Sequence, residues 1–496
     1  MPAPIAQLRE RLAELHDLAA AGGLLGWDQQ TMMPERAAPQ RAEQLGTLGR
    51  IVHERFTDDA IGRLLDAAGD GADGDDAALL RVTRRDWEKA RRVPSELAAE
   101  LARAGALGHQ AWVDARARSD YGAFLPFLQR NVELKLRYVE CFDGYEDPYD
   151  VLLDDYEEGM TSAEVDRLFA ELRAGLVPLI AAIAQRADAV DDAPLHGEFP
   201  VERQRAVVRG VLERLGWDVG GWRLDDAAHP FATSFGPGDV RLTTRYDPRY
   251  VGTALYGAIH EFGHGLYESQ VAERFARTPL GEGVSLGVHE SQSRLWENVV
   301  GRGRPFVGYL HGELARAFPE RLGGVDADAL YRAVNRVQPS LIRVEADEAT
   351  YGLHIILRFE LEREMVAGAV ALRDLPEAWN ARMREYLGVE VPDDANGVLQ
   401  DVHWAGGDIG YFATYALGNL IAAQLWVRAR EELPGLDEAL AAGDGAPLRA
   451  WLGERVHRFG RSIPPRELVA QATGSAIRVE PFLDYLRAKL EPIYGV

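Results

Sequence analysis

Residues 258–268 read AIHEFGHGLYE and contain two histidines four positions apart. On a helix such residues lie about 40° from each other around the axis, so His260 and His264 can bind one metal ion from the same face. Glu261 follows the first histidine, where it can take a proton from a water molecule without binding the metal itself. The pattern favours a zinc-type hydrolytic site. The competing interpretation is two surface histidines on an ordinary helix.

A third ligand is expected in the polar segment that begins at Val288, 24 residues after His264. A buried helix rarely holds so many charged side chains unless they are paired or bind an ion. We predict Glu290 as the ligand and treat Glu297 as the alternative, or as a carboxylate behind the ligands; either could also be an ordinary exposed acid. Two histidines and one glutamate leave a fourth position open, as in catalytic zinc sites. Zinc, cobalt and manganese all suit these ligands to some degree.

The elements around these residues are predicted to be mainly helical. Apolar periodicity predicts a helix over 250–270, and a Thr161-x-x-Glu164 capping box predicts the start of another. Further helical patterns occupy 328–346, 350–369, 375–387 and 411–432. The clearest strand is Asp239–Arg245, just before the metal motif, with Asp239, Arg241 and Thr243 on one face. A polar strand face beside the metal helix suits pairing with an extended peptide, although an ordinary edge strand is the simpler interpretation.

The composition narrows the class of protein. The net charge of −23 over 496 residues disfavours binding to nucleic acids or anionic membranes. Cys141 is the single cysteine, which fits a reducing cytosol, and the sequence shows neither a secretory leader nor a membrane span. Only three lysines occur, so an anion in the site must be bound by arginine.

Six short motifs resemble those of one known family, the Taq-type (thermostable) metallocarboxypeptidases, and the resemblance covers nearly the whole chain. They are H-P-F at His229–Phe231, D-x-R-x-T at Asp239–Thr243, H-E-x-x-H at His260–His264, H-E-S at His289–Ser291, I-R-x-x-A-D at Ile342–Asp347 and G-x-x-Q-D-x-H-W at Gly397–Trp404. All six stand in the family's order. Some relatives of the wider clan carry an acid four residues after the glutamate ligand, where this chain has Arg294. The partner of His260 is therefore left open.

The resemblance implies a cytosolic exopeptidase that removes C-terminal residues one at a time, often as a homodimer. It implies Zn²⁺ as the usual metal, with Co²⁺ as a common substitute. It also implies a two-lobed helical body with a deep groove, similar to neurolysin and angiotensin-converting enzyme. We therefore expect one catalytic unit over residues 1–496. Within it, the helices of residues 1–110 are a hypothetical lid that limits entry to flexible peptides.

Other residues are candidates for contacts with the peptide. The oxyanion formed during hydrolysis needs a hydrogen-bond donor. The resemblance to neurolysin-like enzymes points to Tyr411, with Tyr415 one helical turn further as the alternative. His403 is predicted to contact the peptide backbone. The competing interpretation places these tyrosines in the core with satisfied hydroxyls.

A carboxypeptidase must also bind a free C-terminal carboxylate. Arg343 and Arg241 are the candidates, because a guanidinium can contact a carboxylate with two donors. For Arg343, a salt bridge with its acidic neighbours in sequence competes. His229 is expected to line the substrate groove, although a structural role before Pro230 is the simpler alternative.

The sequence thus predicts a metal-dependent carboxypeptidase that cleaves the C-terminal bond of short unstructured peptides. Two alternatives remain. The first is an endopeptidase or dipeptidase with the same metal site, which would still cut a C-terminally amidated peptide. The second is an inactive helical scaffold that binds peptides. The retained Glu261 argues against this second alternative, because a binding module does not need a catalytic base.

Overall fold

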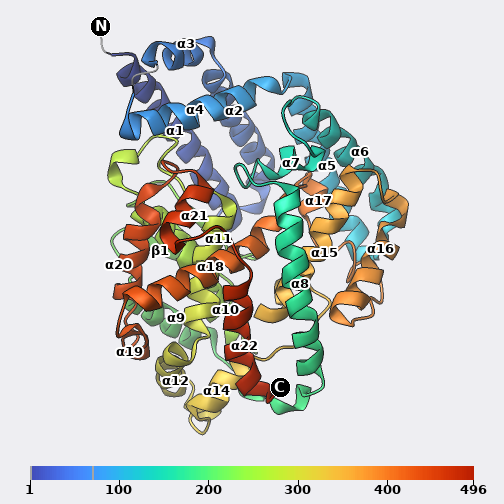
Figure 1. The fold of residues 1–496 in the computed structure, drawn as a ribbon, viewed down its shortest axis with the longest axis vertical. Coiled ribbons are helices and arrows are strands. Elements are labelled where there is room, and N and C mark those ends of the chain that lie inside the picture. Colours follow the sequence, from blue (N-terminus) through green and yellow to red (C-terminus); the bar gives the residue numbers. More distant parts are fainter. Residues whose placement is uncertain (1–2, 70–71) are drawn as a thin grey trace. The chain divides into compact units, whose positions relative to one another are not determined.

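A computed structural model describes residues 3–69 and 72–496 of the chain (Figure 1). The chain divides into two compact units, each built from three stretches that are separate in the sequence. Unit 1 comprises Met1–Arg91, Asp192–Val334 and Leu425–Ala476. Unit 2 comprises Arg92–Asp191, Asn335–Gln424 and Ile477–Val496. The range predicted as a lid, 1–110, is divided between the two units after Arg91.

Unit 1 contains the N-terminal helices, a small sheet and the helices that follow it. Its elements are α1 (Pro4–Thr31), α2 (Ala38–Phe56), α3 (Asp59–Ala68), α4 (Gly74–Arg92), α9 (Val201–Leu215), β1 (Trp222–Asp226), β2 (Ala232–Ser234), β3 (Val240–Thr244), α10 (Gly252–Gln270), α11 (Leu286–Arg294), the π-helix η5 (Leu295–Gly301), α12 (Arg304–Ala317), α13 (Pro319–Leu322), α14 (Ala327–Val334), α19 (Leu436–Ala441), α20 (Ala446–Arg455) and α21 (Pro465–Thr473). Helix α18 (Ala413–Glu432) begins in unit 2 and ends in unit 1.

Unit 2 is helical throughout its described elements. They are α5 (Ser95–Arg118), α6 (Tyr121–Val139), α7 (Pro148–Leu153), α8 (Ser162–Ala184), α15 (Glu348–Val366), α16 (Leu375–Arg382), the π-helix η8 (Met383–Leu387), α17 (His403–Gly406) and α22 (Glu480–Tyr494). Short 3₁₀ turns complete the two units at Glu35–Ala37, Ala187–Ala189, Ala193–Leu195, Glu273–Phe275, Arg343–Glu345, Leu372–Asp374 and His457–Phe459. The predicted mainly helical class with a small sheet is confirmed.

The sheet has three strands in the order β1–β3–β2. Strand β3 pairs in parallel with β1 and antiparallel with β2, so it is the central strand. The strand predicted at 239–245 therefore exists, but it is not an edge strand, and its own backbone is not open for pairing with a peptide. The apolar side chains of Val240 and Leu242 are fully buried and face Gly265 of α10. The sheet thus lies directly against the helix that carries the metal motif.

Local sequence signals explain where several helices begin. The predicted capping box is present: Thr161 Oγ1 accepts a hydrogen bond from the Glu164 backbone, and the Glu164 side chain accepts one from the Thr161 backbone. The Ser285 side chain caps α11 by accepting a hydrogen bond from the Val288 backbone amide, and Asp347 caps α15 by accepting hydrogen bonds from two backbone amides. Each cap satisfies amide groups that the first helical turn leaves without partners.

The helix predicted over 328–346 is wrong beyond Val334. Helix α14 ends there, residues 335–342 are not helical, and Arg343 lies in a 3₁₀ turn before the cap of α15. Pro339 explains part of the difference, because a proline lacks the amide hydrogen of a helix interior and disfavours helical backbone in the residue before it. Within the described part of the chain, none of the helices combines the length and the apolar character that a membrane crossing requires.

Candidate metal centre

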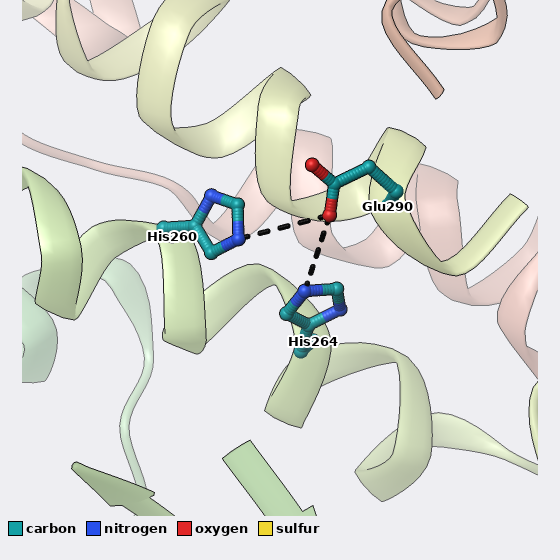
Figure 2. A group of neighbouring side chains, drawn as sticks. All are labelled: His260, His264 and Glu290. Carbon is teal, nitrogen blue, oxygen red and sulfur yellow. Dashed lines mark ion pairs between the residues drawn. The ribbon is translucent and has the colours of Figure 1, made fainter. Parts of the chain in front are cut away.

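Three predicted ligands converge in unit 1. His260 and His264 project from α10, and Glu290 projects from α11, with one carboxylate oxygen aimed at both rings (Figure 2). The Oε2 atom of Glu290 lies 3.7 Å from Nε2 of His260 and 3.4 Å from Nε2 of His264. All three candidate ligand atoms lie within 4.8 Å of one another. Glu290 is 5% exposed, so its charge is held away from bulk water.

The spacing fits a small divalent ion. Ligands placed about 2.1 Å from a tetrahedral zinc ion are roughly 3.4 Å apart, close to the separations seen between these atoms. The other oxygen of Glu290 is already engaged, because Arg294 Nε donates to Oε1 at 2.6 Å. Glu290 therefore has a single oxygen, Oε2, left to bind a metal ion between the three side chains. A set of two imidazoles and one carboxylate with a further position open suits catalytic zinc.

A glycine lets the two ligand helices approach so closely. A Cβ atom on Gly263 would stand 2.6 Å from the backbone oxygen of Gln292 and 2.6 Å from the Cα of Ser293. The side chains on this stretch of α11 are small or polar and fully buried: Ser291, Gln292 and Ser293. The glycine therefore allows the backbones of α10 and α11, which carry the candidate ligands, to approach closely.

His260 is oriented by a carboxylate from the π-helix. Glu297 Oε2 lies 2.9 Å from Nδ1 of His260, and Arg294 and Arg302 both donate to the same carboxylate. Although burial alone would raise it, His260 and these two arginines hold the pKa of Glu297 well below its usual range. Glu290, Arg294 and Glu297 are spaced so that they share one helix face. The partner of His260 that the sequence left open is Glu297, which lies behind the ligands.

His264 is oriented by a second chain of contacts. Its Nδ1 lies 2.6 Å from Nδ1 of His289, whose Nε2 lies 2.7 Å from Oε1 of Glu268. Glu268 stands one helical turn after His264 on α10, so both face α11. Outer contacts of this kind fix the tautomer and the ring plane of a metal-binding histidine.

Glu261 has the environment of a general base. It is 6% exposed on α10 and follows the first ligand. Burial raises the pKa of Glu261 to about 7, against the opposing effect of His260. A carboxylate with a pKa near neutrality can both take up and release a proton at physiological pH.

Four of the predicted substrate residues lie together in unit 2. His403 Nε2 lies 3.4 Å from the Tyr415 hydroxyl, and the His403 ring is 5.2 Å from that of Tyr411. The guanidinium of Arg343 lies over the Tyr415 ring at 5.1 Å. Burial lowers the pKa of His403 to about 4, so the imidazole is neutral at physiological pH. A neutral imidazole beside two tyrosines can donate and accept hydrogen bonds.

Arg343 pairs with a residue distant in sequence rather than with its acidic neighbours. Its Nε and Nη2 donate to Oδ1 of Asp401 at 2.9 and 2.8 Å, and its Nη1 donates to the Tyr351 hydroxyl. Arg358 binds the other oxygen of Asp401 at 2.6 Å. Two guanidinium groups share one carboxylate, so these three side chains carry a net positive charge.

Arg241 and His229 lie in unit 1. Arg241 forms a two-pronged pair with Asp239, at 2.8 and 2.9 Å, and its guanidinium lies 4.4 Å from the ring centroid of Trp27 in α1. Its charge is therefore neutralised locally. His229 is exposed in the turn between β1 and β2. That turn is tied to β3, because the Phe231 backbone donates to Thr243 Oγ1 at 2.8 Å.

Some residues of the site were not predicted in these positions. The sequence interpretation left out Glu268 and Arg302, left His289 unassigned and did not identify the strands β1 and β2. A usable signal existed for Glu268, which stands four residues after His264 and so on the same helix face. No local signal pairs Arg302 with Glu297, since a spacing of five does not place two residues on the same face of an α-helix, and Arg302 follows the end of the π-helix.

The chain is similar to known proteins over its whole length. Residues 7–490 match the family described as "Carboxypeptidase Taq (M32) metallopeptidase". Thermostable carboxypeptidase 1 of Thermus thermophilus is 43% identical over 493 residues, covering 96% of each chain. The crystal structure of the M32 carboxypeptidase from Deinococcus radiodurans R1 has a TM-score of 0.97 and 45% identity, covering 99% of this chain and 100% of its own. A Pyrococcus furiosus carboxypeptidase structure has a TM-score of 0.96 and 37% identity, covering 99% of each chain.

These matches agree with the site geometry. The residues that would bind the metal, His260, His264 and Glu290, converge in the structure, and the buried carboxyl group of Glu261 follows the first of them. The match extends along nearly all of the chain, and the relatives are carboxypeptidases of almost equal length. The chain therefore belongs to the Carboxypeptidase Taq (M32) family of metallopeptidases and is a metal-dependent carboxypeptidase.

Proposed function

We propose that this carboxypeptidase removes residues one at a time from the C-terminus of short, unstructured peptides, with Zn²⁺ held by His260, His264 and Glu290. The observation that carries the proposal is the convergence of these three side chains beside the buried carboxyl group of Glu261. Co²⁺ is proposed as a substitute, because the same imidazole and carboxylate ligands suit both ions.

Glu261 acts as the catalytic base in this proposal. A metal in the site would polarise the scissile carbonyl and lower the pKa of a bound water. Glu261 takes the proton from the attacking water and then delivers it to the amine of the departing residue. The burial of this carboxylate directly beside the first proposed ligand, His260, supports this role.

Tyr411 and His403 are proposed to act on the peptide, and Tyr415 is the alternative to Tyr411. The Tyr411 hydroxyl would donate to the oxyanion, and His403 would donate to a backbone carbonyl of the peptide. One donor to an oxyanion is commonly worth about 3 kcal/mol of transition-state stabilisation. The proximity of the three side chains in unit 2 and the neutrality of His403 support these roles.

Of the two arginines proposed to bind the C-terminal carboxylate, Arg343 has the stronger support. Asp239 supplies both oxygens to Arg241 and balances its charge. Asp401 is shared between Arg343 and Arg358, which leaves excess positive charge for an incoming carboxylate. His229 is proposed to line the path of the peptide.

The setting of the enzyme is proposed as well. The single cysteine supports a cytoplasmic location. The family resemblance alone supports a homodimer, which light scattering on the purified protein would test. The helices of residues 1–110 are proposed to act as a lid. Deleting them and comparing cleavage of short peptides with that of folded proteins tests this: unchanged discrimination in a folded variant would contradict it.

The test of the function is a mass-spectrometric time course on an unstructured peptide with a free C-terminus and on its C-terminally amidated form. Each is run with the metal-loaded enzyme and with a chelator. A ladder of losses from the free C-terminus, blocked by amidation and by the chelator, is the expected result. Internal cuts in both peptides would favour an endopeptidase or dipeptidase, and no cleavage after metal loading would favour an inactive peptide-binding scaffold.

A further inference from the structure

The segment that carries His403 and Tyr411 has little regular structure of its own. Helix α17 covers only His403–Gly406, and turns lead from there to the start of α18 at Ala413. One helical turn is not stable by itself, because a short helix does not offset the cost of nucleation. The position of both side chains must therefore be set by contacts from the surrounding helices of unit 2.

One buried carboxylate contacts this segment at both ends. Glu362, on α15, is fully buried. Its Oε1 accepts a hydrogen bond from the Trp404 indole at 2.8 Å, and its Oε2 accepts one from the Gly410 backbone at 3.0 Å. Trp404 directly follows His403, and Gly410 directly precedes Tyr411. The two hydrogen bonds to Glu362 are therefore made by the residues next in sequence to His403 and Tyr411, the two residues proposed to act on the peptide.

Further contacts hold the same segment from other sides. Asn131 Nδ2 donates to the backbone oxygens of Trp404 and Ala405 at 2.9 and 2.8 Å. A Cβ atom on Gly108 would stand 2.4 Å from the Ala405 oxygen, so α5 packs against the backbone here. Gly410 has a φ of 97°, and a Cβ atom on it would stand 2.7 Å from the backbone oxygen of Leu152. Among the residues named here that contact the segment, Glu362 is the one with an ionisable side chain.

Placing a carboxylate there is costly. Burial raises the pKa of Glu362 to about 7, although the hydrogen bonds from Tyr149, Trp404 and Gly410 oppose that rise. A glutamine would supply one acceptor oxygen, and its amide hydrogens would then face either the indole N–H or the Gly410 N–H. Only a carboxylate accepts at both ends of the segment, and a glutamine would leave one of the two interior donors without an acceptor.

We propose that Glu362 is a positioning residue for catalysis, which fixes the segment His403–Tyr411 by accepting hydrogen bonds from Trp404 and Gly410. This inference rests on the proposed roles of His403 and Tyr411 in peptide cleavage. In this chain the Trp404 indole N–H donates to Glu362, whereas a phenylalanine at this position would have no N–H group to donate.

The test begins with Glu362→Gln in the metal-loaded full-length enzyme. We expect kcat to fall on the order of 10²-fold, since a misplacement of about 1 Å can cost that much, and metal affinity to stay unchanged. Hydrogen exchange measured by mass spectrometry is expected to become faster in residues 403–411 but not in 258–268. Tyr149→Phe is the matched control. It removes a donor to the same carboxylate, at 2.7 Å, without touching the segment, and it should change kcat by less than about 3-fold.

A double-mutant cycle separates positioning from general damage. If Glu362 acts through the Tyr411 hydroxyl, Glu362→Gln should cost much less kcat in a Tyr411→Phe background than in the wild type. Equal fold losses in both backgrounds, an unaltered exchange rate in residues 403–411, or full activity of Tyr411→Phe would each overturn the proposal. If Glu362→Gln does not fold, Trp404→Phe replaces it, because it removes one of the two donors and retains the charge.

Results that contradict the proposed function differ from those that contradict the role of Glu362. A wild-type enzyme that leaves the free C-terminus intact would contradict the function itself. The exchange measurement would still show whether Glu362 holds the segment, and an unaltered rate would overturn the positional part of the inference independently. With an active wild type, a fully active Glu362→Gln overturns the inference and leaves the function standing.

Discussion

The Nδ1 atoms of His264 and His289 lie 2.6 Å apart, so one ring must donate and the other must accept. If Nε2 of His264 binds the metal, its Nδ1 carries the hydrogen and donates to His289. His289 then holds its own hydrogen on Nε2 and donates it to Glu268 at 2.7 Å. The carboxylate of Glu268 thus determines the tautomer of a ligand that it does not touch.

Replacing His289 with alanine should therefore weaken metal binding by about 10- to 100-fold, because His264 loses the partner that orients its ring. Metal affinity is measured by competition with a chelating dye. Glu273→Gln, an exposed charge removal in the same unit, is the control and should leave affinity unchanged. Wild-type affinity in the His289 variant would contradict the orienting role.

Glu261→Gln should abolish turnover while metal stays bound. The amide keeps the shape of the side chain but cannot accept the proton of the attacking water, and loss of a general base costs about 10² to 10⁴ in rate. Metal content is measured alongside peptide cleavage in the same preparation. Unchanged turnover would remove Glu261 from the mechanism, and loss of metal would make it a structural residue of the site.

Gly263→Ala should reduce the free energy of unfolding by about 1–3 kcal/mol, because the added methyl group meets the α11 backbone at 2.6 Å. Urea denaturation measures the change. Gly308→Ala in α12 is the matched control: nothing lies within 4 Å of its added methyl group, and alanine favours a helix by up to about 1 kcal/mol. Equal effects of the two substitutions would show that the close approach of α10 and α11 is not required.

The stability of the fold should depend on pH through Glu362. Its pKa is raised to about 7 in the folded chain from the ordinary value of 4.5, so the folded state binds the proton more tightly than the unfolded state. The resulting contribution to the free energy of unfolding, roughly 3 kcal/mol, is fully present below about pH 4.5 and is lost as the pH rises through 7. The titratable groups that interact with this carboxylate include Tyr149, Tyr156, Asp408 and Lys135.

The measurement compares urea unfolding of the wild type and Glu362→Gln at pH 5 and pH 8. The wild type should lose more stability over this interval than the variant, which has no proton to release at this position. Because other groups titrate in both proteins, only the difference between the two pH dependences reports on Glu362. Parallel dependences would contradict the raised pKa.

Local patterns allowed the metal-bearing part of the chain to be predicted. His260 and His264 are related by helical spacing, and Glu290 stood out because charges are rare on a buried helix face. Strand β2 has three residues, too few to show an alternating pattern. The pairing of Arg343 with Asp401 and that of Glu362 with Trp404 join residues more than 40 positions apart. Such contacts depend on how the helices pack and leave no periodic trace in the sequence.

Arg294 has a consequence for the choice of ion. By engaging Oε1 of Glu290, it leaves the carboxylate able to coordinate through one oxygen only. Calcium needs 6–8 oxygen ligands and often binds a carboxylate through both oxygens. An ion such as zinc, which needs only four or five ligands, binds equally well to a carboxylate that offers one oxygen. A metal bound here should therefore be one that accepts a single carboxylate oxygen from Glu290, and Arg294→Gln should narrow the difference in affinity between zinc and calcium in a competition titration.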